Sequence, residues 1–219
     1  MSEALTHFRD TLAAFYLQEA ERAAGGAHAL RTIAQRLRDP GLARGKPERQ
    51  DLPAMAQLAE TLGMAEAGPL GALASAFAAV EPELAWVQNS NYADAGTAPD
   101  FLRNYAYCVV AGPKGLLQVD DILVSAIVIG PECLYPAHAH EAEEVYHLLA
   151  GPSYWWREGE DWVWRKPGAC IHHRSWQQHA TKTASTSMLA IASWKGDSGK
   201  LSQFARNARI PALPSERLP

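Results

Sequence analysis

The sequence predicts a mainly β fold preceded by an α-helical N-terminal extension. In the first part of the chain, apolar residues recur at the three- and four-residue spacing of amphipathic helices. In the second part, short apolar runs are separated by Gly- and Pro-containing turns at intervals of about 8 to 12 residues, the pattern of a β-sandwich or barrel. We therefore expect a helical extension over residues 1–100 that packs on a barrel over residues 101–219.

Four helices are expected in the extension. The first begins after Ser2, a residue suited to capping a helix, and is stopped by Gly25 and Gly26. Asp39-Pro40-Gly41 ends the second. The expected helices cover residues 3–24, 27–38, 52–63 and 69–79. Residues 42–50 are predicted to form a basic, polar loop, and residues 89–99 a long irregular connection.

Nine strands are expected in the barrel region, because runs rich in β-branched and aromatic residues lie between turns such as Gly130-Pro131 and Pro167-Gly168. They cover residues 104–111, 121–130, 133–140, 144–150, 153–157, 161–165, 169–173, 178–183 and 187–195. The N-terminal helices are expected either to cap this barrel or to make a dimer contact, so a homodimer is compatible with the sequence.

The composition argues against several classes of protein. A hydrophobic content of 47% and a charged content of 20% predict a packed core. The net charge of −4 argues against a nucleic-acid partner and against attraction to anionic membranes. Cys108, Cys133 and Cys170 lie far apart, which argues against a disulfide framework. No signal sequence or apolar run of about 20 residues is found, so a cytoplasmic location is expected.

Most of the candidate metal-binding and catalytic side chains lie in residues 130–151. Because side chains alternate along a strand, His138 and His140 point to the same face of the predicted strand that contains them. On the next predicted strand Glu144 and Tyr146 share a face, and His147 takes the other. If the two strands pair, four polar groups converge inside an apolar sheet, which is costly unless something binds them. Imidazole and carboxylate are ligands of zinc, iron, manganese and nickel.

This spacing resembles the first motif of the cupins, which are jelly-roll β-barrels. Gly130, His138-x-His140, Glu144 and Gly151 carry that resemblance. A second block, in which Pro167-Gly168 starts a strand and His179 follows, is similar to the second cupin motif. The resemblance implies a cupin barrel with its site inside. The distance from the Pro-Gly turn favours His179 as the last ligand over His172 and His173, which are alternatives as outer partners of the ligands.

A narrower resemblance, over about residues 105–198, is to the cupin dimethylsulfoniopropionate (DMSP) lyases. It rests on the two motif blocks together with the spacing from Tyr135 to Tyr146 and on Trp194-x-Gly196-Asp197. It implies metal ligands at His138, His140, Glu144 and His179. It also implies that Tyr146 is the catalytic base, with Tyr135 as a second candidate, and that Tyr135 and Trp194 line the substrate pocket.

The activity implied by this resemblance is the cleavage of DMSP into dimethyl sulfide and acrylate by β-elimination. One divalent transition metal is expected, with Zn²⁺ favoured because no redox change is needed and with Fe²⁺, Mn²⁺ or Ni²⁺ as alternatives. Tyr146, ionised beside that cation, would remove the proton next to the carboxylate. The same ligands also suit a cupin dioxygenase, and the fold also suits a non-catalytic small-molecule-binding domain.

Overall fold

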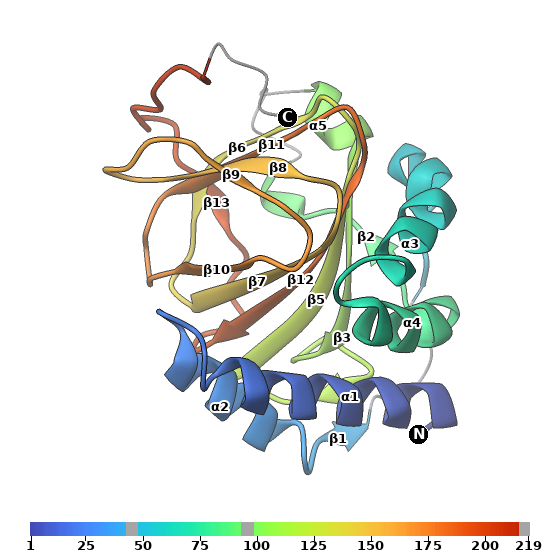
Figure 1. Ribbon diagram of the computed structural model, residues 1–219. Coiled ribbons are helices and arrows are strands. Elements are labelled where there is room, and N and C mark those ends of the chain that lie inside the picture. The colour runs from blue at the N-terminus through green and yellow to red at the C-terminus, as the bar shows by residue number, and fades with distance from the viewer. Residues whose placement is uncertain (43–47, 93–98, 215–219) are drawn as a thin grey trace.

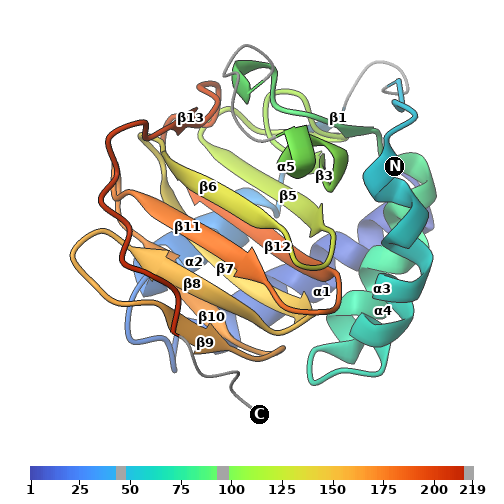
Figure 2. The same ribbon diagram turned by 90° about the horizontal axis from the view of Figure 1, so that it is seen from above.

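The computed structural model describes residues 1–42, 48–92 and 99–214. Two β-sheets face each other, and helices from the N-terminal part cover the outer face of the larger sheet (Figure 1). Seen from above, the smaller sheet lies over the larger one, and the first two helices lie beneath both (Figure 2). The mainly β fold with N-terminal helices is therefore confirmed.

The larger sheet is mostly antiparallel, and it is ordered β1-β4-β3-β5-β12-β7-β10, with β2 paired to β3. Its strands are β1 (Gly41–Leu42), β2 (Trp86–Val87), β3 (Tyr105–Ala111), β4 (Leu117–Gln118), β5 (Ile122–Ile129), β7 (Glu143–Ala150), β10 (Cys170–His173) and β12 (Met188–Lys195). The long central strands β5, β12 and β7 are almost wholly buried, as expected of a sheet covered on both faces, and β5 is rich in β-branched residues.

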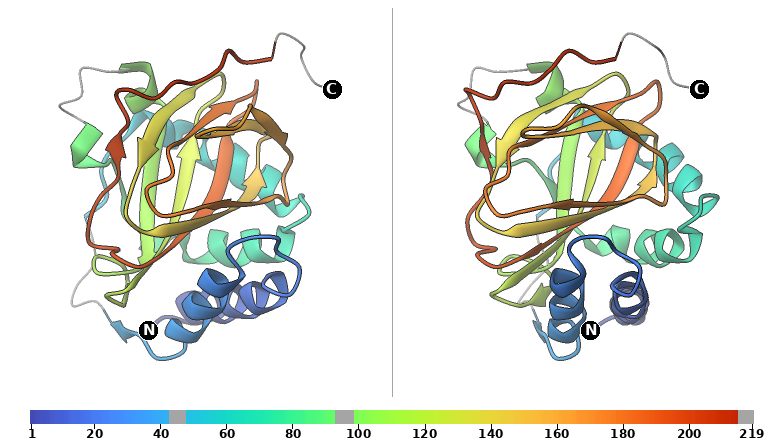
Figure 3. Two further views of the ribbon diagram at one scale, coloured as in Figure 1. Left: turned by 90° about the vertical axis from the view of Figure 1, so that its left-hand side faces the viewer. Right: turned by 60° about the vertical axis from the view of Figure 1, so that its left-hand side comes forward.

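The smaller sheet is antiparallel and closes the other side of the barrel (Figure 3). Its order is β13-β6-β11-β8-β9. The strands are β6 (Leu134–Ala139), β8 (Ser153–Arg157), β9 (Val163–Arg165), β11 (His179–Thr183) and β13 (Gln203–Phe204). Two residues of β11, His179 and Thr181, oppose His138 and Tyr135 of β6 across a shift in register. This shift is a β-bulge, which turns side chains of β6 from their regular alternation.

The helices form a layer against the larger sheet, with α2 and α3 in contact with β7 and β12. The helices of this layer are α1 (Glu3–Glu19), α2 (Ala27–Arg36), α3 (Leu58–Glu66) and α4 (Gly71–Val80), with 3-10 turns at Pro53–Gln57, Glu81–Glu83 and Ser90–Tyr92. The short α5 (Pro99–Arg103) lies apart from this layer and contacts β3 and β6. Ser2 caps α1, because its side-chain oxygen accepts a hydrogen bond from the backbone N–H of Leu5. The phenol of Tyr16 lies 2.5 Å from the buried Ser193 hydroxyl and so joins α1 to β12.

The strand predictions agree with the structure to within two residues at every boundary. The helix predictions were wrong in detail. The first helix ends at Glu19 rather than at residue 24, because its buried apolar stripe ends near Tyr16 and Ala20. The third begins as a 3-10 turn at Pro53, since proline lacks a backbone N–H and favours a helix start. The very short strands β1, β2, β4 and β13, and α5, carried too little pattern to be predicted.

Two parts of the predicted loops lie outside the described residues, namely 43–47 and 93–98. Within the rest of the expected connection at 89–99, residues 90–92 form a 3-10 turn. The division of the chain at residue 100 stays a prediction, and the short strands β1 and β2, from before that point, join the larger sheet. Among the described helices, none is long and apolar enough to cross a membrane.

The alternation of side chains on the larger sheet produces two buried regions. One lies under the helices and is built from aliphatic and aromatic residues of both layers. The other lies between the sheets and contains most of the tyrosines of the barrel. The outward-facing His147 belongs to the first side, whereas Glu144 and Tyr146 belong to the second. Neighbouring residues of β7 thus face two different buried regions, one under the helices and one between the sheets.

Candidate metal and active site

The four predicted ligands come from both sheets and meet between them. His138 lies near the end of β6 and His140 directly follows that strand, while His179 begins β11 opposite His138. Glu144 lies near the start of β7 in the facing sheet. All four side chains are buried. The nitrogens and oxygens of His140, Glu144 and His179 that could bind a metal lie within 4.8 Å of one another.

His138 stands slightly apart from that group. Its ring centroid is 4.1 Å from that of His179 and 6.4 Å from that of His140. No donor atom of His138 falls within the 4.8 Å cluster, so the described arrangement is a compact group of three with a fourth imidazole beside it.

The hydrogen bonds of the three histidines have the form expected of metal ligands. In each ring Nδ1 lies 2.8 to 2.9 Å from a backbone carbonyl oxygen: His138 to Pro136, His140 to Ala142 and His179 to Gln177. A carbonyl only accepts, so each Nδ1 carries the proton and donates. In the neutral imidazole the Nε2 lone pair is then free, which is the usual way a protein orients a metal-binding histidine.

The surroundings of the Glu144 carboxylate point to a cation. Its Oε2 atom lies 3.1 Å from Nε2 of His140 and 3.1 Å from Nε2 of His179. The two ring nitrogens carry lone pairs when their protons sit on Nδ1, and lone pairs facing a carboxylate oxygen repel it. A metal ion between them removes that repulsion, and three imidazoles with one carboxylate are a donor set that zinc and its neighbours accept. The residues present therefore fit a divalent cation.

Burial and the neighbouring imidazoles together set the protonation of the group. Burial by itself raises the pKa of the Glu144 carboxyl, but the surrounding imidazoles, His140 foremost, outweigh it and hold the pKa well below its usual range. Burial, together with the neighbouring His179, lowers the pKa of His138 well below its usual range. The carboxylate is thus ionised and His138 is neutral, which are the forms that bind metals.

The predicted pocket residues lie against these ligands. Trp194 on β12 donates its indole N–H to Oε1 of Glu144 at 2.6 Å and stacks on His140 at 4.2 Å. This contact follows from register, since Trp194 pairs with Glu144 across β12 and β7. Tyr135 stacks on His138 at 3.9 Å, and its hydroxyl lies 2.8 Å from that of Tyr92. Trp194 therefore holds a ligand as well as lining the pocket.

Tyr146 lies two residues after Glu144, and the two share one cavity with Tyr135 and Trp194. Burial raises the pKa of Tyr146 well above its usual value, and the charge of Glu144 raises it further. The cavity takes up about 730 Å³ when the open solvent at its mouth is included.

Several residues that line the cavity or contact a ligand were not predicted to do so, although strand alternation and register point to them. Tyr105 and Tyr107 of β3 line the cavity at alternating positions, as do Leu123, Ser125 and Ile127 of β5 beside them. His173, left open as an outer partner, pairs with Glu144 across β10 and β7. Its Nδ1 lies 3.1 Å from Oε2 of Glu144, and its ring stacks on His179 at 3.9 Å.

The other histidines lie elsewhere. His147 packs against Phe15 and Tyr16 of α1 on the outer face of the sheet, as its parity predicted. His172 binds Glu143 at 2.9 Å, away from the cavity. The structure therefore gathers His138, His140, Glu144, His179, Tyr135, Tyr146 and Trp194 and adds His173, and the roles predicted for these residues stay proposals.

Two curated proteins are similar to this chain. DddL from Cereibacter sphaeroides, described as a dimethylsulfoniopropionate lyase, is 29% identical over 190 residues, which cover 82% of this chain and 78% of that protein. The dimethylsulfoniopropionate lyase DddQ from Ruegeria pomeroyi is 31% identical over 127 residues, which cover 58% of this chain and 62% of DddQ.

Two solved structures share the fold. One, from a study of the DMSP lyases RdDddP and RnDddQII, has a TM-score of 0.72 at 23% identity and covers 93% of this chain and 98% of its own. The other, DddQ from Ruegeria pomeroyi, has a TM-score of 0.70 at 23% identity and covers 91% and 96%. The barrel and the helical extension thus occur together in both, and the expected cupin architecture is confirmed.

A family model described as dimethylsulfoniopropionate lyase matches residues 26–190, which is most of the chain and contains every residue of the site except Trp194. The match begins before α2 and so includes most of the helical layer as well as the barrel. This chain belongs to the dimethylsulfoniopropionate lyase family, a family of carbon–sulfur lyases.

Proposed function

We propose that this protein cleaves DMSP into dimethyl sulfide and acrylate by β-elimination, with one divalent cation held by His138, His140, Glu144 and His179. The observation that carries the proposal is that Tyr146 lines a single aromatic-lined cavity together with Glu144, whose carboxylate lies within the ligand group. Family membership supports the choice of substrate, since the curated relatives are described as DMSP lyases.

The cation is the first part of the proposal. When bound, it supplies Lewis-acid polarisation of the substrate carboxylate, which makes the neighbouring C–H group more acidic. The three Nδ1–carbonyl hydrogen bonds fix the imidazoles with Nε2 available, and the Trp194 indole fixes the carboxylate of Glu144. Zn²⁺ is favoured because the reaction needs no redox change. Fe²⁺, Mn²⁺ and Ni²⁺ are accepted by the same ligands.

Tyr146 is proposed as the general base. Its position on β7, two residues from Glu144, sets the phenol in the cavity beside the ligand group. Burial keeps this phenol protonated in the protein alone, so the phenolate requires positive charge nearby. Tyr135 is the second candidate, but its hydroxyl already pairs with that of Tyr92, and burial likewise raises its pKa. The geometry therefore favours Tyr146.

The cavity wall suits the sulfonium end of the substrate. Faces of aromatic rings attract cations, including sulfonium groups, within about 6 Å of the ring centre. Tyr105, Tyr107, Tyr135 and Trp194 line the cavity. Tyr92 supports them from behind, through its contacts with Tyr135 and Tyr105. We propose that these aromatic rings hold the dimethylsulfonium group until it leaves.

The bond changes balance without any further reactant. Tyr146 takes the proton from the carbon next to the carboxylate. The electron pair of that C–H bond forms the carbon–carbon double bond of acrylate. The electron pair of the C–S bond leaves with the sulfur atom, which departs as neutral dimethyl sulfide. The proton on Tyr146 then returns to solvent, and the side chain is ready for another cycle.

The test is gas chromatography of the headspace over purified protein that has been stripped with a chelator and reloaded with single metals. Equimolar dimethyl sulfide and acrylate, restored by metal and independent of oxygen, is the expected result. Product formation that required oxygen and iron would favour the dioxygenase alternative. Folded, metal-loaded protein that bound DMSP without cleaving it would favour the non-catalytic alternative and overturn the proposal. The cytoplasmic location, the homodimer and the lack of a nucleic-acid partner stay predictions.

A further inference from the structure

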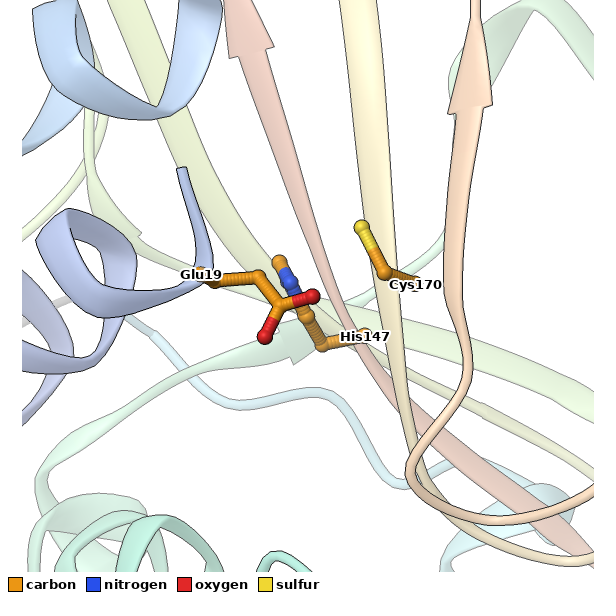
Figure 4. Close-up of side chains that lie close together, drawn as sticks. All are labelled: Glu19, His147 and Cys170. Carbon is orange, nitrogen blue, oxygen red and sulfur yellow. The ribbon is translucent and has the colours of Figure 1, made fainter. Parts of the chain in front are cut away.

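A second group of metal-binding side chains lies on the opposite face of β7 from the barrel site. It consists of Glu19 at the end of α1, His147 of β7 and Cys170 of β10. Figure 4 shows the carboxylate of Glu19 extending toward the imidazole of His147, with Cys170 on the strand beside it. His147 and Cys170 are direct partners in the β7–β10 register. The carboxylate, ring and thiol donors all lie within 4.8 Å of one another.

His147 is a buried polar group whose ring nitrogens are unpaired in the part of the chain that the structure describes. Its side chain is fully buried, and neither ring nitrogen has a hydrogen-bond partner among the described residues. Aromatic rings pack around it, with the centroid of Phe15 at 4.9 Å and that of Tyr16 at 5.2 Å. Buried polar atoms in folded proteins are nearly always paired, so an imidazole with two unpaired nitrogens calls for an explanation.

The charge on the helix adds an independent reason. The end of α1 carries the negative end of the helix dipole, where cations are favoured and acids are not. The last turn of α1 nevertheless contains Glu19 and has no basic residue. Within the described parts of the chain, no basic side chain forms an ion pair with Glu19. A cation at this point would compensate both the carboxylate and the helix end.

We infer that Glu19, His147 and Cys170 bind a divalent cation of the zinc type, at a site separate from the one inside the barrel. Thiolate, imidazole and carboxylate together are donors that zinc accepts and that calcium and magnesium do not. Ligand atoms around a tetrahedral zinc lie about 3.6 Å apart, so small side-chain rotations from the present separation suffice. Glu19 and Cys170 are both half-buried, which gives the ion a route from solvent.

A reactive-cysteine role fits this cluster less well. Burial, with a smaller effect from the Glu19 carboxylate, raises the pKa of the Cys170 thiol to about 12. Nucleophilic and redox-active cysteines instead have lowered pKa values in electropositive surroundings. The carboxylate beside the thiol is suited to holding a cation and not to activating a thiolate.

The test uses Co²⁺ as a spectroscopic substitute for zinc. The barrel site contains no sulfur, so a thiolate-to-cobalt charge-transfer band in the near ultraviolet reports the second site alone. Titrating the metal-free full-length protein with Co²⁺ is expected to produce this band and a total of two bound ions per chain. Cys170→Ser is expected to abolish the band and leave one ion, and Glu19→Gln to weaken Co²⁺ binding at the second site at least tenfold.

Cys133→Ser is the matched control, because Cys133 is a buried cysteine outside the cluster. This variant is expected to keep the band and both ions. A folded wild-type protein without the band at saturating Co²⁺, or a band that survived in Cys170→Ser, would overturn the inference. Because cleavage of DMSP is not the readout, failure here is distinguishable from failure of the proposed lyase function.

Discussion

Glu144 and His147 lie three residues apart on β7, and both are buried polar side chains, but their surroundings are opposite in character. Glu144 faces the barrel interior, where an indole and three imidazoles surround its carboxylate. His147 faces the helices, where aromatic rings surround it and neither nitrogen is paired among the described residues. Both side chains are fully buried or nearly so.

The contrast shows how much depends on which face of a strand a residue occupies. On the inner face, polar side chains from both sheets converge and form a connected network. On the outer face, His147 meets a largely apolar helix layer, and the carboxylate of Glu19 from α1 and the thiol of Cys170 from β10 lie beside it. The inner network therefore presents several ligand atoms that suit a cation. The outer group has an unpaired imidazole among the described residues, and a bound ion would supply its partner.

The largest expected effect is at Tyr146. Tyr146→Phe removes the proposed base from the inner face and should lower the rate of dimethyl sulfide release by ~10²–10⁴-fold, the usual contribution of a positioned general base. Metal content, measured by mass spectrometry, should stay unchanged. Tyr107→Phe is the matched control, since Tyr107 lines the same cavity but is proposed to act through its ring. Equal losses in the two variants would contradict the assignment of the base.

Glu144→Gln should have the next largest effect, on metal binding. The neutral amide removes the negative charge at the centre of the ligand group, so affinity for Zn²⁺ should fall by more than ~100-fold, measured by competition with a chelating dye. Glu143→Gln is the control, because the neighbouring Glu143 pairs with His172 and Lys195 away from the cavity. Stoichiometric, tightly held metal in Glu144→Gln combined with Cys170→Ser, which removes the outer site, would break the inner site as we describe it.

The burial of His147 on the outer face of β7 should make the free energy of unfolding depend on pH. Burial lowers the pKa of His147 to about 3, against about 6.5 in an unfolded chain, so the unfolded chain binds one more proton between these values. Stability from this group is present above pH 6.5 and is lost as the pH falls toward 3. The metal-free wild type should therefore lose about 2 kcal/mol more than His147→Phe between pH 7 and pH 5, measured by urea unfolding.

The groups that face His147 bear on this experiment. They are Glu19 and Tyr16 from α1 and Cys170 from β10. They stay in place in the variant, and phenylalanine suits the aromatic surroundings. His28→Gln, at an exposed histidine, should keep the wild-type slope. An identical slope in wild type and His147→Phe would show that His147 is not buried in its neutral form.

The smallest effect is expected at Trp194. Trp194→Phe keeps an aromatic ring on His140 but removes the hydrogen bond to Glu144, so Zn²⁺ affinity should fall by about tenfold, as for other residues that orient a metal ligand. Trp162→Phe is the control, because its indole N–H binds the backbone carbonyl of Pro211, away from the site. No change in Trp194→Phe would mean that the indole serves only the pocket.

Residues with strong local patterns could be predicted from the sequence. The alternation in His138-x-His140 and Glu144-x-Tyr146, with the turn at Pro167-Gly168, was enough to predict four ligands that the structure gathers between the sheets. The strands were predictable for the same reason, since period-two patterns and turn residues are local. Short pieces such as β13 have no pattern of their own and form only because a neighbouring strand pairs with them.

The contact between Tyr135 and His138 could not be predicted from the local sequence pattern. Strict alternation would put Tyr135 and His138 on opposite faces, yet their rings stack at 3.9 Å. The register shift between β6 and β11 brings them together, and such a bulge depends on how two strands meet. His173 was left as one of two alternatives for a similar reason, because its distance from Glu144 is set by the pairing of β10 with β7.

By itself, the sequence determined the fold class, the succession of the longer helices and strands, and the residues of the barrel site able to bind a metal, because these depend on side-chain chemistry and on spacing along the chain. Only the tertiary structure decided which groups meet across strands: His173 and Trp194 with Glu144, the tyrosines of β3 with the cavity, and Glu19 with His147 and Cys170. The physical reason is that register, bulges and helix packing are set by long-range pairing, which no local pattern encodes.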